Sequence, residues 1–307
     1  MSASQRIEPL IVAGATATGK SAVAMELARL LDGEIVSVDS MQVYRGLDLG
    51  TAKPTAAERM EVRHHLVDVV EWTEPFDAAR FVQLAQEAIH DSVARGKTPI
   101  LCGGTGMYFN AWLNGLGASP APDPVLRAQL EQRSMPELLD ELARMDPVAF
   151  NEVDLENRRR VVRAVEVIRL TGRPFSQQRA QWPERAPGMI GRSFGLMRSR
   201  EDTVQRINLR VDLMFRAGLI EETRHLLEQG LGSNRTAMQA IGYRQVAEYL
   251  QGERTRMETM ELVKVRTRQF AKRQLTWFRG QLDLQWLELG KEEPPEQTAA
   301  RIRSILT

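Results

Sequence analysis

The segment Gly14–Ser21, with the sequence GATATGKS, holds residue types that together bind phosphate groups. Gly14 and Gly19 allow the backbone to turn so that successive N–H groups point inward, toward phosphate oxygens. Lys20 supplies a positive charge for the terminal phosphate, and the Ser21 hydroxyl is a ligand for Mg²⁺. An apolar run precedes the segment and an apolar-periodic stretch follows it, which is the strand–loop–helix setting of a phosphate loop. We therefore expect a diphosphate site made by Gly14, Ala15, Thr16, Ala17, Thr18, Gly19, Lys20 and Ser21.

Two further residues that could take part in chemistry follow predicted strands. Asp39 ends the apolar run 34–38, and Thr105 follows the run 98–102 within the turn GGTG. Ligands of open α/β sheets bind at the carboxyl ends of the strands, so both residues are expected beside the phosphate loop. Asp39 can also be a strand-end turn residue, and that alternative stays open. A nucleotide hydrolase would normally place a magnesium-binding Asp at the second turn, so the GGTG sequence disfavours an ATPase.

The elements that would hold these residues alternate between strands and helices. Predicted strands cover residues 8–13, 34–38, 64–70, 98–102 and 193–197. Predicted helices cover residues 20–31, 77–96, 201–216, 221–229 and 257–279. This alternation, with a phosphate loop after the first strand, predicts an α/β fold: a P-loop-type parallel sheet core flanked by helices. We also expect Gly33 to cap the first helix in a left-handed conformation, His64 and His65 to lie at a strand edge, and Cys102 to be buried.

The composition changes after the second glycine turn. Residues 116–124 are rich in proline and are typical of a linker, and helical patterns follow without a strand between them. Asp123 and Ser134 are predicted helix caps, and residues 157–171 form a further amphipathic helix. We therefore predict three segments: residues 1–115 as the first part of the core, 116–194 as an all-helical insertion domain, and 195–307 as the second part of the core with a basic C-terminal helix.

Basic residues gather on two of the predicted helices. Arg159 and Arg163 share one face of their helix, one turn apart and away from its apolar stripe. In the helix 257–279, no acidic residue interrupts the stretch from Lys264 to Arg279, and aromatic residues are interleaved. A basic helix with aromatic residues suits a nucleic-acid backbone. The alternative is a solvated helix whose aromatic residues belong to the core.

The composition excludes several other classes of protein. The 307 residues are 43% hydrophobic and 26% charged, which is typical of a globular protein. Lys and Arg total 41 against 40 for Asp and Glu, so any nucleic-acid surface must be a local patch. The single Cys102 excludes an internal disulfide, and four scattered His disfavour a metal cluster. Because neither a signal peptide nor a membrane span is recognisable, we expect a cytoplasmic protein without membrane contact. Nothing indicates an obligate partner subunit, so we expect a monomer.

A series of motifs in chain order resembles one family, the tRNA dimethylallyltransferases, also called tRNA isopentenyltransferases or IPP transferases. The motifs are GATATGKS at 14–21, DSMQVYRGLDLGTAKP at 39–54, HHLVD at 64–68, GGTGMY at 103–108, RRVVRAVE at 159–166, TGRPFS at 171–176, AIGYRQ at 240–245 and TRQFAKRQLTWFR at 267–279. The resemblance covers nearly the whole chain. Ala15 stands where the family usually has Pro, and Met107 where it often has Leu; neither is a catalytic side chain.

The resemblance implies transfer of a dimethylallyl group from its diphosphate to the exocyclic N6 amine of the adenosine just 3′ of the anticodon of a tRNA. The phosphate loop would then bind the diphosphate of the prenyl donor. Lys20 and a Mg²⁺ held by Ser21 would stabilise the charge that grows on the leaving diphosphate. Arg210 would be a further phosphate clamp, Thr105 would hydrogen-bond the reacting region, and Asp39 would accept the proton of the amine.

The resemblance also implies a set of tRNA contacts around the anticodon stem-loop. Residues beside Asp39 would read the extruded base, the insertion would grip one side of the stem-loop, and the motif 240–245 with the basic helix would hold the other side. The implied contact residues are Asp39, Ser40, Met41, Gln42, Thr105, Arg127, Arg159, Arg160, Val161, Val162, Arg163, Ala240, Ile241, Gly242, Tyr243, Arg244, Gln245, Lys272, Arg273, Gln274, Trp277 and Arg279.

Three alternatives to this hypothesis remain open at this point. A P-loop small-molecule kinase would use Asp39 as the base for a substrate hydroxyl. An adenylate isopentenyltransferase would modify free AMP or ADP, although a mononucleotide needs neither the insertion nor the basic helix. A non-catalytic RNA-binding protein would leave the phosphate loop and Asp39 without a role.

Overall fold

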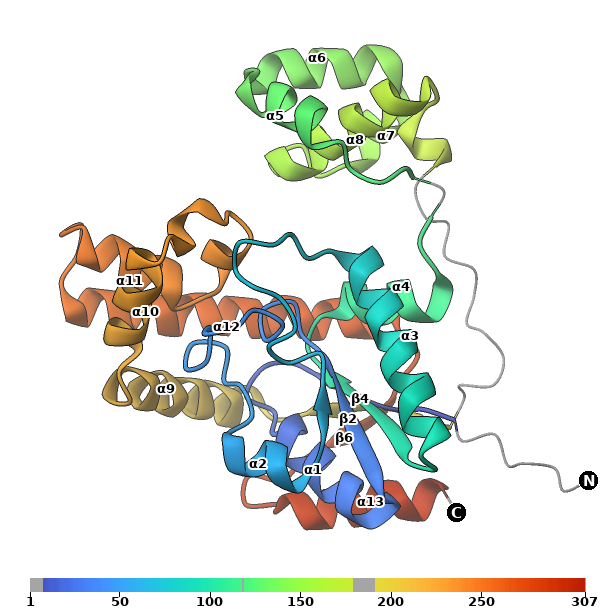
Figure 1. The fold of residues 1–307 in the computed structure, drawn as a ribbon, viewed down its shortest axis with the longest axis vertical. Coiled ribbons are helices and arrows are strands. Elements are labelled where there is room, and N and C mark those ends of the chain that lie inside the picture. The colour runs from blue at the N-terminus through green and yellow to red at the C-terminus, as the bar shows by residue number, and fades with distance from the viewer. Residues whose placement is uncertain (1–7, 118, 179–190, 307) are drawn as a thin grey trace, which may run out of the picture. The chain divides into compact units, whose positions relative to one another are not determined.

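The computed structural model describes residues 8–117, 119–178 and 191–306 (Figure 1). The chain divides into two compact units, one formed by residues 1–113 and 185–307 and the other by residues 114–184. The first unit is the α/β unit and the second is the helical unit. The predicted insertion was 116–194, but Ser193 and Phe194 pair with β1 and belong to the α/β unit.

The α/β unit is built on a parallel sheet of six strands, which confirms the predicted fold class. The strands are β1 (Leu10–Gly14), β2 (Gly33–Val38), β3 (His64–His65), β4 (Thr98–Gly103), β5 (Ser193–Met197) and β6 (Gln285–Glu288). Their order in the sheet is β3-β2-β4-β1-β5-β6, and every neighbouring pair is parallel. β1 lies between β4 and β5 and is buried along its whole length, as expected for a strand covered on both faces.

Helices surround this sheet. They are α1 (Lys20–Leu31), α2 (Ala56–Glu61), α3 (Ala78–Ala94), α4 (Gly106–Asn114), α9 (Arg200–Arg216), α10 (Leu219–Glu228), α11 (Tyr243–Leu250), α12 (Arg256–Gln281) and α13 (Pro295–Leu306). Because successive strand residues point to opposite faces, Leu10 and Val12 join one hydrophobic cluster with α1 and α13. Ile11 and Ala13 join the other cluster, which includes residues of α3, α9 and α12.

Three local predictions for the α/β unit were wrong. The strand predicted over 64–70 is only His64–His65, because Leu66 and Asp68 have φ angles of 59° and 56° that break the extended chain. Asp32, not Gly33, takes the left-handed position after α1, with φ of 47°. The basic helix is not the last element either, since β6 and α13 follow it. Asp77 is the N-cap of α3, because its side chain accepts from Arg80 N.

The helical unit contains α5 (Pro124–Gln132), α6 (Met135–Met145), α7 (Pro147–Glu152), α8 (Arg158–Thr171) and the 3₁₀ turn η1 (Phe175–Gln177). Both predicted caps are confirmed: Asp123 accepts from Leu126 N at 2.8 Å, and Ser134 forms a capping box with Glu137. Within the described residues of this unit there is no strand. Its core is a separate cluster that includes Leu130 and Leu142.

Gly103 at the end of β4 gives a stability prediction. A Cβ at this position would lie 2.0 Å from the carbonyl oxygen of Val38, and backbone of a paired strand cannot yield to it cheaply. We expect Gly103→Ala to lower the free energy of unfolding by about 1–3 kcal/mol or more, measured by chemical denaturation. Gly280→Ala is the control, because a Cβ there meets nothing within 4 Å and should leave stability unchanged or slightly higher.

Candidate active site

The phosphate loop connects β1 to α1 and has the geometry that its glycines predict. Gly19 has φ of 95°, which favours glycine, and a Cβ on Gly14 would lie 2.7 Å from the Leu196 carbonyl oxygen of β5. The Thr18 hydroxyl donates to Ala15 O at 2.9 Å and closes the loop on itself. The two glycines thus allow a close turn beside β5, and helix α1 begins at the end of this loop.

Two cationic side chains contact this loop. Lys20 Nζ donates to Ala15 O at 3.2 Å, and Arg210 of α9 donates to the Thr16 hydroxyl at 3.3 Å. Burial lowers the pKa of Lys20, the nearby Arg210 lowers it further, and the Asp39 carboxylate opposes this shift. Burial and the neighbouring Arg206 also lower the pKa of Arg210. Neither Lys20 nor Arg210 forms an ion pair with any described residue, so the loop carries positive charge suited to a diphosphate.

Asp39 and Thr105 lie at the carboxyl ends of the paired strands β2 and β4. Asp39 Oδ1 accepts from the backbone N–H groups of Met41 at 2.8 Å and Gln42 at 3.2 Å, so Asp39 is a turn residue. Its second oxygen, Oδ2, accepts no hydrogen bond from the described residues. Thr105 N donates to Val38 O, and its hydroxyl accepts from Ser40 N at 3.1 Å. One carboxylate therefore fixes the turn with Oδ1 and presents Oδ2 for another partner.

The segment 39–54 forms turns with no helix or strand, and its own side chains hold it. Gln42 donates to the carbonyl oxygens of Thr51 and Ala52 and accepts from the Ser37 hydroxyl. The Gln42 side chain is therefore committed to this segment. Met41 is half-buried against the core. Of the polar residues expected to read a base, Ser40 has a hydroxyl with no hydrogen-bond partner among the described residues, and Asp39 has only its Oδ1 engaged.

The motif 240–245 contacts the segment 39–54. All of its residues were expected to contact tRNA, but several of its side chains are buried. Tyr243 is fully buried, accepts from Gly50 N at 3.1 Å and donates to Glu222. Ala240 and Gln245 are also buried, and Gln245 Oε1 accepts from Gly242 N at 2.8 Å.

In the folded protein these three side chains, Ala240, Tyr243 and Gln245, are thus not available to RNA. Arg244 is the exposed member of the motif, and Ile241 is half-buried. Burial raises the pKa of Glu222, whose oxygens accept from Leu49 N and from Tyr243. The motif therefore acts on the segment 39–54 mainly by packing and hydrogen bonding.

Helix α12 carries several of the residues expected to contact tRNA, and some of them are exposed while others are buried. Lys272, Arg273 and Arg279 are exposed and remain candidates for RNA contacts. Trp277 is half-buried against Gly106, where a Cβ would lie 2.0 Å from its ring. Gln274 is only 8% exposed and its side chain bonds within the protein, unlike that of an exposed RNA contact.

In the helical unit, too, some of the residues expected to contact tRNA are exposed and others are buried. Val161 and Val162 are 0% and 3% exposed in the core of the unit, so their side chains are not RNA contacts. Arg127 and Arg163 both pair with Glu166, which is fully buried. Removing either arginine would leave the buried carboxylate of Glu166 less well neutralised, so the first role of both arginines is structural. Arg159 and Arg160 are exposed on α8.

One residue that holds the phosphate loop escaped the sequence analysis. Arg198 is buried directly after β5, and its Nε donates to Thr18 O of the phosphate loop at 2.8 Å. Its Nη1 donates to an Asp202 carboxylate oxygen at 2.9 Å and to Gly290 O at 2.7 Å. A charged residue directly after an apolar strand was the available signal. Gln274 was expected as an RNA contact through the family resemblance, but its bonds to the two glycine turns were not predicted.

The remaining titratable groups near the sheet are structural. Cys102 is buried as predicted, its Sγ lies 3.7 Å from Lys20 O, and burial raises the pKa of its thiol to about 11. His65 bonds Glu34 at 2.7 Å, and His64 bonds Val62 O, which confirms their predicted place at a strand edge. Among the described residues, no cluster of three His, Cys, Asp or Glu side chains could hold a metal ion.

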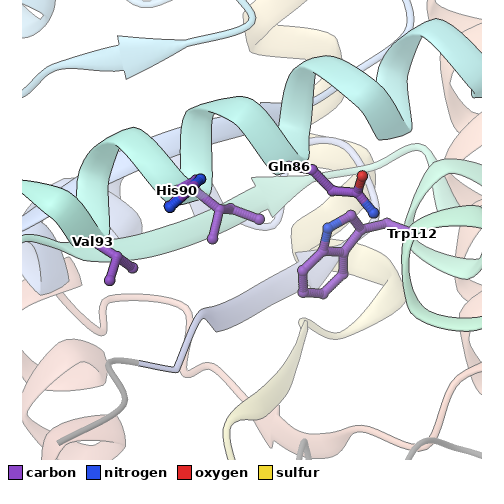
Figure 2. A pocket seen from close by; sticks show the side chains of 5 residues that line it. Gln86, His90, Val93 and Trp112 are labelled. Carbon is purple, nitrogen blue, oxygen red and sulfur yellow. The ribbon is translucent and has the colours of Figure 1, made fainter. Parts of the chain in front are cut away.

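A hollow elsewhere on the α/β unit has no part in this site. It is lined by Gln86, Ile89, His90 and Val93 of α3 and by Trp112 of α4 (Figure 2). None of these residues bonds the phosphate loop or Asp39.

The fold and the site together define a phosphate-loop α/β protein with a carboxylate at the end of a nearby strand and exposed basic side chains. The sequence profile of the IPP transferase family matches residues 42–281. The chain belongs to the IPP transferase family.

Individual relatives agree with this assignment. A tRNA dimethylallyltransferase of Trichlorobacter lovleyi is 46% identical over 95% of this chain and 97% of its own. One from Pelobacter propionicus is 43% identical over 97% and 96%. The crystal structure of the full-length tRNA isopentenylpyrophosphate transferase of Bacillus halodurans has 36% identity and a TM-score of 0.70, covering 98% of this chain and 97% of that one. A eukaryotic dimethylallyltransferase acting on tRNA has 27% identity and a TM-score of 0.78, covering 97% and 77%.

The helices give no sign of membrane insertion. In the described part of the chain, each helix is too short or too polar to span a bilayer.

Proposed function

We propose that this protein transfers a dimethylallyl group from dimethylallyl diphosphate to the exocyclic N6 amine of the adenosine just 3′ of the anticodon of tRNA. The relatives named above supply the reaction class. The observation that carries the assignment is the placement of Asp39 Oδ2 at the strand ends beside a phosphate loop with two cations that lack carboxylate partners. We expect a monomer that works in the cytoplasm, where tRNA is found.

The donor half of the reaction falls to the phosphate loop. The bond between the allylic carbon and the diphosphate oxygen breaks, and negative charge grows on the leaving diphosphate. Lys20, Arg210 and the N–H groups at the start of α1 are placed to stabilise that charge. Mg²⁺ usually takes one or two protein oxygens plus phosphate oxygens, and the exposed Ser21 hydroxyl with a donor diphosphate fits this pattern. When bound, the ion would neutralise charge on the leaving diphosphate.

The acceptor half falls to Asp39 and Thr105. A new N–C bond forms between the adenine amine and the allylic carbon, and the amine loses a proton. Asp39 Oδ2 is the proposed acceptor of this proton, because Oδ1 is already held by two backbone N–H groups. An adenine amine is a poor nucleophile, so positioning should contribute heavily, with about 7–11 kcal/mol as the upper range.

The target base must leave its stack to reach this site, at a cost of about a few kcal/mol. Exposed basic residues are suited to holding the RNA while the base is extruded. Among the basic residues that the resemblance implies as tRNA contacts, those exposed in the described part of the chain are Arg159 and Arg160 in the helical unit and Arg244, Lys272, Arg273 and Arg279 in the α/β unit. These residues are our proposed tRNA surface.

The proposed function is tested by incubating the protein with dimethylallyl diphosphate, Mg²⁺ and an unmodified anticodon stem-loop. Mass spectrometry should find one added C5 unit on the adenosine that follows the anticodon. Parallel reactions with AMP or ADP as the acceptor, and with ATP in place of the prenyl donor, separate the alternatives. Prenylated AMP or ADP without modified RNA, or ATP turnover without any prenyl product, would overturn the proposal.

Removal of charge from α8 should weaken RNA binding. We expect the double variant Arg159→Ala, Arg160→Ala to bind the stem-loop less tightly and to reduce the slope of log K against log salt by about 1–2, because each lost phosphate contact contributes about 0.7–0.9. Filter binding at several salt concentrations measures this. Arg144→Ala, an exposed arginine of α6 in the same unit, is the control. An unchanged slope in the double variant would remove α8 from the tRNA surface.

A further inference from the structure

Gln274 of α12 bonds both glycine turns of the site. Its Oε1 accepts from Thr16 N in the phosphate loop at 2.8 Å, and its Nε2 donates to Gly104 O in the GGTG turn at 2.8 Å. The side chain is 8% exposed. One amide thus joins two turns that are far apart in the sequence.

The glycines of the second turn make this contact possible. A Cβ on Gly104 would lie 2.4 Å from Gln274 Nε2, and one on Gly106 would lie 2.0 Å from the ring of Trp277. Phe278, on the same helix, packs edge-on against Phe109 of α4 with ring centroids 6.1 Å apart. Helix α12 is therefore pressed against the second turn, and the position of the Gln274 amide is fixed by packing.

The amide also lies within a series of contacts that reaches both ends of the reaction site. The Thr16 hydroxyl accepts from Arg210, while the Thr16 N–H donates to Gln274. On the other side, Gly104 is followed by Thr105, whose hydroxyl accepts from Ser40 N beside Asp39. Since Gln274 accepts from the Thr16 N–H, the shape of the phosphate loop is set before any phosphate is bound.

We propose that Gln274 is a positioning residue that sets the distance between the leaving diphosphate and the amine that attacks. This inference rests on the proposed function and deepens it. An amide is required because one position must accept from an N–H and the other must donate to a carbonyl. A glutamate would keep the acceptor, lose the donor, and place a negative charge near the diphosphate. Gln274 then affects the rate of transfer and not the binding of RNA.

The test compares Gln274→Ala and Gln274→Glu with Gln269→Ala, an exposed glutamine of the same helix. Single-turnover rates at saturating donor and stem-loop, stem-loop Kd at two salt concentrations, and thermal unfolding are measured for each variant. We expect both Gln274 variants to lose about 10–100-fold in rate, because a displacement of about 1 Å can cost that much. Their stem-loop Kd and its salt dependence should stay within about twofold of the wild type. Gln269→Ala should match the wild type throughout.

A double-mutant cycle adds a readout that general destabilisation would not give. Gly104→Ala should lower the rate alone, because its methyl group displaces the amide, but should cost little more in the Gln274→Ala background. If Gln274→Ala fails to fold, Gln274→Glu decides, because it keeps the side-chain volume. A weaker Kd with an intact saturated rate would make Gln274 an RNA contact and overturn the inference, as would wild-type rates in both variants. Absence of prenyl product with the wild type would instead overturn the proposed function.

Discussion

Asp39→Asn should lower the single-turnover rate of prenyl transfer by about 10²–10⁴-fold while leaving stem-loop binding nearly unchanged. The range is that of a lost general base. Asparagine keeps an oxygen that can accept from the Met41 and Gln42 N–H groups, so the turn is retained while the proton acceptor is lost. Rapid-quench measurements at saturating donor and RNA give the rate, and filter binding gives the affinity.

Asp39→Ala provides the comparison that separates the two roles of this carboxylate. It should nearly abolish the product, because both the turn and the base are lost. Full activity in Asp39→Asn with loss of activity in Asp39→Ala would show that Asp39 acts only as a turn residue. The role of base would then have to be given to another group.

Lys20→Ala should lower the rate of transfer by about 10²–10³-fold, the effect typical of removing one group that stabilises charge developing in the transition state. Burial lowers the pKa of Lys20. No described carboxylate pairs with this side chain, so its positive charge is available to a diphosphate bound at the phosphate loop. Isothermal titration with inorganic diphosphate and Mg²⁺ should show weaker binding in the variant.

Lys97→Ala is the control for Lys20→Ala, because Lys97 lies on the surface and pairs with Asp32. It should match the wild type in both rate and diphosphate binding. A Lys20→Ala variant that kept its rate and its affinity for diphosphate would contradict the assigned role of the phosphate loop.

The sequence predicted best those features that depend on neighbouring residues. The phosphate loop follows from Gly14 and Gly19 with the strand and helix around them, and the caps at Asp123 and Ser134 follow from local side-chain bonding. The strand predicted over 64–70 was wrong because an apolar run does not reveal a positive φ angle. Val161 is fully buried, although it lies in a motif that resembles an RNA contact, so a family motif does not show which of its side chains reach the surface.

The features that could not be predicted depend on residues distant in the chain. Gln274 and Thr16 are 258 positions apart, and Arg198 and Thr18 are 180 apart. No local pattern distinguishes a glutamine that bonds two loops from one on a solvated helix face. Tyr243 could not be predicted to accept a hydrogen bond from Gly50 N either, because this bond depends on the packing of α10 and α11 against the segment 39–54.

The single sulfhydryl of this chain has a practical consequence. With a pKa of about 11, Cys102 is a thiolate in only about one molecule in 10⁴ at neutral pH, and it is also shielded from reagents. Oxidants and maleimides should therefore react with it slowly. The unmodified chain is a ready background for attaching one fluorophore to a cysteine introduced on the surface, so that tRNA association can be followed without first removing a native thiol.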